Sequence, residues 1–185
     1  AMILGDNFFY GQSLTSQLLE NTKLNKGARV VLHKVPKPEA FGVAKINNKK
    51  KIISIKEKPK KFLSDLAITG LYFFDNNVVK YSKKLKPSKR GEVEIVDLLK
   101  IYQRKNQLSA DIIGRGGAWL DTGSIEDFYK TSAFVSAIEN RQGFKIACLE
   151  EIALNNKWIN KRDLANAIKF YGKCEYSNYL KKISL

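Results

Sequence analysis

Short apolar runs separated by polar residues predict several strands along this chain. Residues 2–4 are apolar and are closed by Gly5, which suits the end of a buried strand. Residues 66–75 (LAITGLYFFD) are nearly all apolar and rich in β-branched and aromatic side chains, which is typical of a strand covered on both faces. The polar turn at residues 47–49 predicts a hairpin around it. Further strands are expected at residues 28–35, 42–46, 51–57, 108–114 and 117–123.

Helices are expected between these strands. Leucines recur at helical spacing within residues 12–26, and Gly27 ends this helix. Ser124 begins a longer helix, because its hydroxyl can cap the first turn. Strands that alternate with helices predict an α/β fold with a sheet covered on both faces. Further helices are expected at residues 76–85, 92–105, 149–155, 161–170 and 176–183.

The composition predicts a folded protein, and the lack of a membrane span or signal peptide in this sequence favours the cytoplasm. The chain has 185 residues, of which 44% are hydrophobic, and this excludes a disordered chain. No apolar run approaches the roughly 18 residues of a membrane span, and the first residues lack the features of a signal peptide. Cys148 and Cys174 have neither CxxC spacing nor histidine neighbours, which excludes a cysteine metal cluster and a disulfide framework.

A strong positive charge raises the question of anionic partners. Lys and Arg number 33 against 18 Asp and Glu, a net charge of +15. Residues 45–61 hold eight lysines against Glu57 alone, and residues 80–90 hold six basic residues and no acid. Nucleic acid, a phosphorylated metabolite and plain solvated surface all stay open on charge alone. No aromatic residue interrupts residues 45–61, and no recognition-helix or RNP motif occurs, so we expect no nucleic-acid partner.

Two aspartates occupy positions typical of a ligand site. Asp6 and Asp121 each follow a short apolar strand and precede a turn. Such positions expose carboxylates at the edge of an α/β sheet where ligands bind. Two carboxylates there could hold Mg²⁺, with water and substrate phosphates as the other ligands. Each aspartate could equally form a turn or cap a helix.

Two charged motifs could bind a phosphate. Glu57 and Lys58 end a hairpin strand just before Pro59. Because successive strand residues face opposite ways, both can serve one pocket only if the backbone twists or bulges locally; the alternative is an exposed charge pair. Arg90 precedes Gly91 at the start of a helix, where a guanidinium and backbone N–H groups could receive a phosphate. Arg90 could also simply end a basic loop.

Longer segments go beyond these weak signals. They are LGDNFFYGQSL, FGVAKI, IISIKEKPKK, AITGLYFFD, LKPSKRGEVEIVDL and GRGGAWLDTGSIEDFYKTSAFVSAIENRQGFKIACLEEIA. Through these segments, the chain resembles the sugar-nucleotide pyrophosphorylases, and most closely the glucose-1-phosphate thymidylyltransferases. The RGE-EI-D segment and the RQG-KIAC-EEIA tail favour the thymidylyl branch.

This resemblance implies a fold and an activity. The fold is a Rossmann-like nucleotide-diphospho-sugar transferase fold: a mixed sheet with flanking helices over residues 1–142 and a helical tail over 143–185. The activity is the reaction of dTTP with glucose 1-phosphate to give dTDP-glucose and pyrophosphate, with Mg²⁺ as cofactor. Family members are homo-oligomers, commonly tetramers. They open with a nucleotide-binding unit carrying a GxGTRL-type loop, which these residues lack, so we expect this chain alone to make no dTDP-glucose.

The resemblance also assigns roles to individual residues. Asp6 and Asp121 match the Mg²⁺ ligands, and Lys58 and Arg90 match the catalytic pair that grips the sugar phosphate. Glu57 matches the acceptor for glucose hydroxyls. Gly42 lets its backbone approach the sugar, while Phe41 departs from the usual tyrosine and removes a hydroxyl. The sugar pocket would be lined by Leu4, Ile68, Tyr72 and Trp119, although core packing explains each of these nearly as well.

Relatives carry a second nucleotide site for feedback inhibition. Its matching residues here are Tyr10, Gly11, Arg115 and Glu151, but Asn155 stands where relatives usually have arginine, so we expect weakened feedback. Two other functions stay open beside the transferase. One is a sugar-phosphate-binding or assembly module without activity, and the other is a basic nucleic-acid-binding domain.

Overall fold

The computed structural model describes residues 1–88 and 91–184. The chain forms two compact units, Ala1–Phe128 and Tyr129–Leu185. The division falls within the long helix α4 (Ile125–Gln142), whereas the sequence places the boundary at the end of this helix, and that boundary stays a prediction. Among the described residues, no helix is long and apolar enough to cross a membrane.

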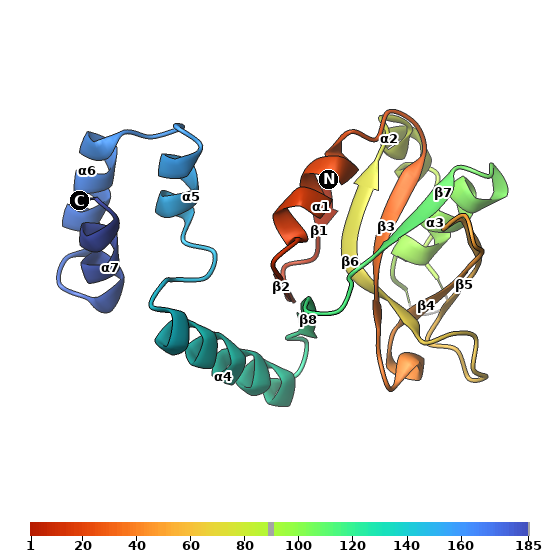
Figure 1. Ribbon diagram of the computed structural model, residues 1–185. Coiled ribbons are helices and arrows are strands. Elements are labelled where there is room, and N and C mark those ends of the chain that lie inside the picture. The colour runs from red at the N-terminus through yellow and green to blue at the C-terminus, as the bar shows by residue number, and fades with distance from the viewer. Residues whose placement is uncertain (89–90, 185) are drawn as a thin grey trace. The chain divides into compact units, whose positions relative to one another are not determined.

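The first unit is built on a mixed sheet, as the sequence predicts (Figure 1). Its strand order is β5-β4-β6-β3-β7, and the short strand β1 pairs with β6 beside the path. Only the β3–β7 pair is parallel among the described strands. The strands are β1 (Met2–Ile3), β3 (Ala28–Lys34), β4 (Gly42–Ile46), β5 (Ile52–Glu57), β6 (Leu66–Phe74) and β7 (Leu108–Ile112).

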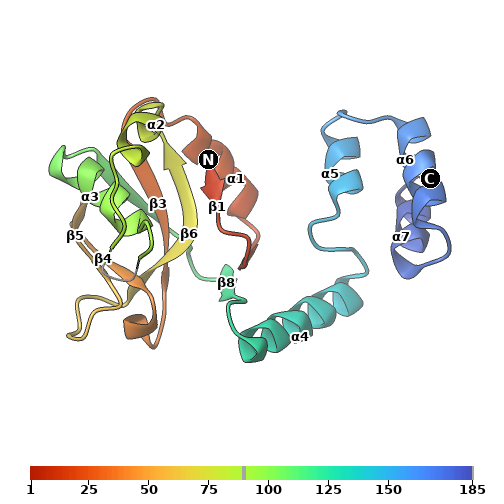
Figure 2. The same cartoon turned by 180° about the vertical axis from the view of Figure 1, so that it is seen from behind.

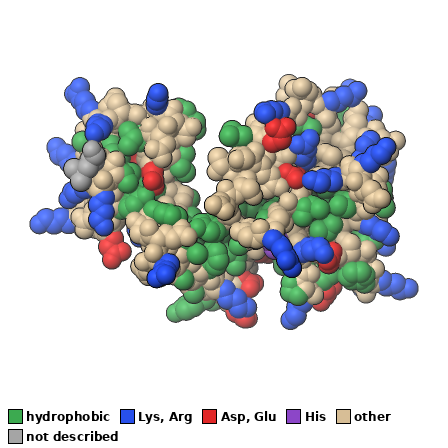
Figure 3. Space-filling view, viewed as in Figure 1, with side chains coloured by type: hydrophobic (Ala, Val, Ile, Leu, Met, Phe, Trp, Pro, Cys, Tyr) green, Lys and Arg blue, Asp and Glu red, His purple; other side chains and the backbone are tan. Residues whose placement is uncertain are grey.

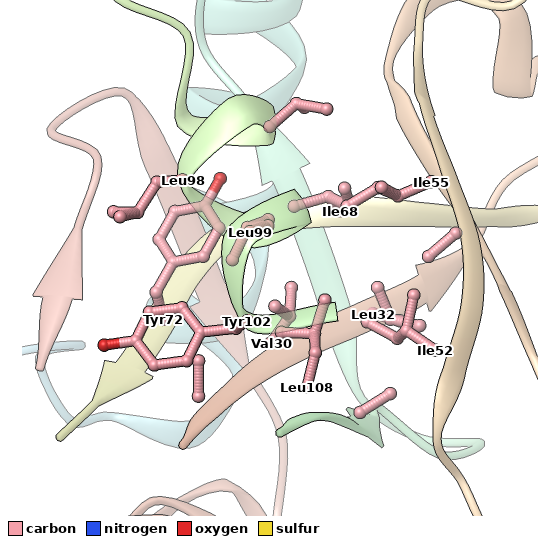
Figure 4. Packing of buried hydrophobic residues seen from close by; sticks show 14 of the residues in the cluster. Val30, Leu32, Ile52, Ile55, Ile68, Tyr72, Leu98, Leu99, Tyr102 and Leu108 are labelled. Carbon is pink, nitrogen blue, oxygen red and sulfur yellow. The ribbon is translucent and has the colours of Figure 1, made fainter. Parts of the chain in front are cut away.

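Helices cover both faces of this sheet (Figures 1 and 2). Because side chains alternate across a strand, Val30, Leu32 and Tyr72 pack against α3, while Val31 and Leu71 pack on the side of α1. Figure 4 shows Leu99 and Tyr102 of α3 over the first of these faces. The α/β prediction is therefore confirmed. The helices that precede α4 in this unit are α1 (Leu14–Thr22), η1 (Pro38–Ala40), α2 (Asn77–Ser82) and α3 (Ile95–Arg104).

Strand β6 lies at the centre of the sheet, as its sequence predicts. Eight of its nine residues are buried, and it pairs with β3 along one side and with β1 and β4 along the other. The register between β3 and β6 shifts between Val30 and Leu32. At this shift, the buried Thr69 hydroxyl donates to the Val31 carbonyl oxygen at 2.9 Å.

A second, two-stranded sheet is absent from the sequence prediction. It pairs β2 (Asn7–Tyr10) with β8 (Ala118–Asp121) in antiparallel register. Residues 7–10 are too few to show a clear strand periodicity, and their partner strand lies more than a hundred residues away. This sheet has a direct consequence for the site, because it places Asn7 opposite Asp121.

The second unit contains the short helices that the sequence predicts. They are α5 (Leu149–Asn155), α6 (Lys161–Tyr171) and α7 (Glu175–Ile183), joined by a core of Cys148, Leu164, Tyr179 and Leu180. Carboxylates of α5 accept hydrogen bonds from tyrosines: Glu150 from Tyr171 and Tyr176, and Glu151 from Tyr179. These bonds tie α5 to α6 and α7.

Asp75 joins three elements of the first unit where β6 ends. Its carboxylate accepts from the Gly27 backbone N–H at 2.8 Å, the Tyr102 hydroxyl at 2.9 Å and the Asn77 backbone N–H at 3.0 Å. Burial disfavours the charged form, but these bonds outweigh burial and hold the pKa of Asp75 below its usual value. Burial and the same carboxylate raise the pKa of Tyr102.

Replacing Asp75 with alanine should therefore lower the free energy of unfolding by about 2–4 kcal/mol, because each buried donor left without a partner costs about 1–3 kcal/mol. Urea denaturation followed by circular dichroism measures this change. The depressed pKa adds stability above the unfolded pKa of about 4, and this stability is lost as the pH falls through the folded pKa. The Asp75→Ala variant should therefore lose less stability than the wild type as the pH falls through this range.

The control is Asp65→Ala, which removes an exposed ion pair with Lys34. It should lower the free energy of unfolding by less than about 1 kcal/mol. Equal losses of stability in the two variants would contradict the role of Asp75.

Candidate functional site

A cavity of about 220 Å³ opens in the first unit. Drug-sized ligands usually occupy roughly 300–1,000 Å³, so this volume suits a smaller molecule. Nine residues predicted as site residues line this one cavity, drawn from both sheets. The lining consists of Leu4, Asp6, Asn7, Ala40, Phe41, Gly42, Glu57, Lys58, Ile68, Gly70, Tyr72, Ile95, Val96, Trp119 and Asp121.

Asp6 and Asp121 are brought to the same end of the β2–β8 sheet, and both line the cavity. Asn7 pairs with Asp121 across this sheet, and Thr122 donates to the Asp6 carbonyl oxygen from its backbone N–H at 2.7 Å and its hydroxyl at 2.8 Å. The Asp6 Oδ1 atom accepts from the Asn7 amide at 2.8 Å, and the Asp121 Oδ1 atom accepts from the Gly123 backbone N–H at 3.0 Å. Both carboxylates are thus held in place by neighbouring donors.

Among the described residues, no group of three or more His, Cys, Asp and Glu is placed to hold a metal ion. A cation bound by Asp6 and Asp121 would therefore need further ligands of other kinds, such as water or substrate oxygens. Oxygen ligands of this kind suit Mg²⁺, which keeps several waters and binds through one or two carboxylates.

Glu57 and Lys58 both line the cavity although they are neighbours in sequence. A regular strand would point them to opposite faces. Lys58 has a left-handed backbone conformation with φ +38°, and its N–H donates to the Phe41 carbonyl oxygen at 3.0 Å. The local twist that the sequence requires for a shared pocket is therefore present. A non-glycine residue in this conformation costs about 1–2 kcal/mol, which the surrounding structure must offset.

Gly42 leaves room for the Glu57 carboxylate. A Cβ atom at residue 42 would lie 2.9 Å from Glu57 Oε2 and 3.3 Å from Ile68 Cδ1. A larger residue would therefore push Glu57 from its position and narrow the cavity. Gly42 and Glu57 are also direct partners in the β4–β5 pairing, so the strand register itself sets this close approach.

The apolar wall of the cavity is shared with the core. Ile68 and Tyr72 are both core residues and cavity residues, so the packing role and the lining role hold together. Burial raises the pKa of Tyr72, and the charge of Glu57 adds to this effect. This shift makes the Tyr72 hydroxyl, which is protonated at neutral pH in any case, still harder to ionise. Trp119 packs edge-on against Phe41, with ring centroids 5.1 Å apart.

The sequence analysis misses five residues of the cavity lining, Asn7, Ala40, Gly70, Ile95 and Val96, and two of these make close contacts there. Asn7 accepts a hydrogen bond from Trp119 Nε1 at 2.7 Å and donates to Asp6. Gly70 interrupts the apolar run of β6 and has φ +75°. The signal for Gly70 was present, since an isolated glycine inside a strand pattern indicates a bulge or a close backbone approach. Nothing in the sequence around Asn7 indicates its partners.

Arg90, the predicted partner of Lys58, lies outside the described residues. The predicted regulatory residues lie in both units and that site stays a prediction. Tyr10 pairs with Ala118 across the small sheet, and a Cβ atom on Gly11 would lie 2.9 Å from Gly117 Cα, in the loop that follows Arg115. Glu151 belongs to the second unit, where its carboxylate accepts from Tyr179 at 2.6 Å.

The basic side chains extend from the outside of both units on the face drawn in Figure 3. They are spread over this face, with acidic side chains among them. On this face the excess charge is therefore dispersed surface charge.

Comparisons with known proteins place these observations in a family context. The sequence model of the family described as nucleotidyl transferase matches residues 1–138. A glucose-1-phosphate thymidylyltransferase of Neisseria meningitidis is 45% identical over 98% of this chain and 63% of its own length. One of Neisseria gonorrhoeae is 47% identical over 97% of this chain and 62% of its own length. The chain thus spans somewhat less than two thirds of these relatives.

Solved structures give the same picture of the fold. A structure from Bacillus anthracis named as a glucose-1-phosphate thymidylyltransferase, in complex with sucrose, is 42% identical and has a TM-score of 0.62 over 71% of this chain and 52% of its own. A UDP-glucose pyrophosphorylase without ligand has a TM-score of 0.61 at 22% identity, over 75% of this chain and 54% of its own. The second likeness supports the fold alone.

Proposed function

The chain belongs to the nucleotidyl transferase family, and we propose that it supplies the sugar-phosphate and metal-binding residues of a glucose-1-phosphate thymidylyltransferase. In that reaction a phosphate oxygen of glucose 1-phosphate attacks the α-phosphorus of dTTP. The bond from this phosphorus to the bridging oxygen breaks, and pyrophosphate leaves. The observation that carries the proposal is the single cavity that joins the Asp6–Asp121 pair to Glu57, Lys58 and Gly42.

Different residues of the cavity bind different parts of the substrate. Glu57 accepts hydrogen bonds from glucose hydroxyls, and the open backbone at Gly42 lets the sugar lie close to the β4 strand. The Lys58 ammonium binds the phosphate as a compact positive charge. Because these groups are fixed by strand pairing and by the backbone conformation of Lys58, the sugar phosphate is held in one orientation.

Asp6 and Asp121 fit a magnesium ion in this scheme. Both present hard oxygen donors on the same cavity, and each carboxylate is oriented by a hydrogen bond to its Oδ1 atom. Asp6 and Asp121 would hold such an ion, which would supply positive charge to neutralise the charge that develops on phosphate oxygens during transfer. Lys58 would position the attacking phosphate.

Titration calorimetry of this chain with glucose 1-phosphate in the presence of Mg²⁺ tests the proposal. Glucose 1-phosphate should bind at least about 10-fold more tightly than glucose, because a hydrogen bond to a charged group contributes about 1.5–3 kcal/mol. The variant Lys61→Ala, which alters an exposed lysine outside the cavity, serves as the control and should bind like the wild type. Equal affinity for glucose and glucose 1-phosphate would refute the phosphate-binding role.

A further inference from the structure

We propose that Gly70 and Asn7 form a positioning pair, in which the missing side chain of Gly70 seats the Asn7 amide where it holds Asp6 and Trp119 together. This inference rests on the proposed function and goes beyond it, because it assigns a role to two residues that need not contact the substrate.

The Asn7 amide uses both of its ends. Its Nδ2 atom donates to Asp6 Oδ1 at 2.8 Å, and its Oδ1 atom accepts from Trp119 Nε1 at 2.7 Å. A carboxylate requires a donor and an indole N–H requires an acceptor, so the two partners fix the orientation of the amide. One side chain therefore links a proposed metal ligand to the aromatic wall of the sugar cavity.

Gly70 makes the place for this amide. A Cβ atom at residue 70 would lie 2.9 Å from Asn7 Nδ2, 3.1 Å from Asn7 Cγ and 3.0 Å from Leu4 Cδ1. The Gly70 carbonyl oxygen accepts from the Leu4 backbone N–H at 3.0 Å, which fixes the segment that carries Asp6 and Asn7 against β6. Any side chain at residue 70 would have to displace the amide or this segment.

The backbone conformation of β6 at Gly70 agrees with this close approach of the Asn7 amide. Gly70 has φ +75° in the middle of a buried strand, where glycine is normally unfavourable. The register shift of β3 opposite this point and the hydrogen bond from Thr69 to Val31 accommodate the unusual conformation. Glycine weakens a central strand, and the close approach of the Asn7 amide explains why glycine nevertheless occupies residue 70.

Two substitutions that act through the same amide test the pair. Gly70→Ala displaces the amide, and Asn7→Leu removes its hydrogen bonds at similar size. Each should lower the affinity of the chain for Mn²⁺, measured by electron paramagnetic resonance, and for glucose 1-phosphate by about 10- to 100-fold, as is usual when an orienting partner of a metal ligand is lost. The double variant should lose little more than either single variant, because both changes remove one shared arrangement.

The control Gly143→Ala separates positioning from backbone strain. Gly143 also has φ +75°, but a Cβ atom added there would meet no atom of the described residues within 4 Å, and it belongs to the second unit. The Gly143→Ala variant should have a lower midpoint of urea unfolding, while its affinities for Mn²⁺ and glucose 1-phosphate stay unchanged. In a Trp158→Phe background, the emission of Trp119 should shift with Gly70→Ala and not with Gly143→Ala.

The outcomes distinguish this inference from the proposed function. If the wild type binds neither Mn²⁺ nor glucose 1-phosphate, the proposed function fails and the positioning role fails with it. If the wild type binds both, while folded Gly70→Ala and Asn7→Leu variants stay within twofold of it, only the positioning role is refuted. Fully additive losses in the double variant would also contradict a shared amide.

Discussion

Replacing Lys58 with glycine should weaken the binding of glucose 1-phosphate by about 10- to 150-fold while the folded chain becomes more stable. The loss of affinity follows from removing a charged hydrogen-bond donor to phosphate, worth about 1.5–3 kcal/mol. The gain in stability, up to about 1 kcal/mol, follows from the left-handed backbone at this residue, φ +38°, which glycine adopts without steric cost.

Titration calorimetry and urea denaturation of the same samples measure the two effects. Lys157→Gly is a matched control, since Lys157 also has a left-handed backbone, φ +59°, but is exposed in the second unit. This control should gain similar stability and leave the affinity for glucose 1-phosphate unchanged. Undiminished affinity in the Lys58→Gly variant would show that Lys58 does not bind the phosphate.

Replacing Asp121 with asparagine should lower the affinity for Mn²⁺ by more than about 100-fold. Loss of a partner that merely orients a metal ligand already costs about 10- to 100-fold, and this change removes the charge of a proposed ligand itself. Asparagine can keep the hydrogen bond from Gly123 to Oδ1, so the fold of the turn is preserved. Electron paramagnetic resonance of bound Mn²⁺ measures the change.

The control for this substitution is Asp65→Asn. Asp65 lies outside the cavity and forms an ion pair with Lys34 at 3.0 Å, so the same loss of charge should leave Mn²⁺ binding unchanged. Comparable affinities in the Asp121→Asn and Asp65→Asn variants would rule out a metal site at Asp121.

Much of the fold could be predicted from local sequence patterns. The apolar run at 66–75 predicts the buried central strand β6, and the polar turn at 47–49 predicts the β4–β5 hairpin. Both depend on neighbouring residues alone. Helix α1 ends at Thr22, before the glycine taken as its stop, and its buried Asn21 accepts a hydrogen bond from Arg29 and donates one to Asp111. Such distant partners leave no mark on a local pattern.

The site was predicted as a set of residues, while its geometry required the structure. Strand β2 pairs with a segment more than a hundred residues away, so no local signal places Asp6 beside Asp121. The left-handed backbone at Lys58 is equally hidden, because lysine has no preference for it. The roles of Asn7 and Gly70 depend on contacts between three separate segments, which only the folded chain brings together.

A crystal structure of this chain with glucose 1-phosphate and Mn²⁺ is the most direct test of the proposed sugar-phosphate and metal site. Anomalous scattering locates the manganese without reference to the protein. We expect a manganese peak coordinated by Asp6 and Asp121, with the sugar hydroxyls at Glu57 and the phosphate at Lys58 in the same cavity. Manganese bound away from both aspartates, or glucose 1-phosphate bound outside this cavity, would contradict this expectation.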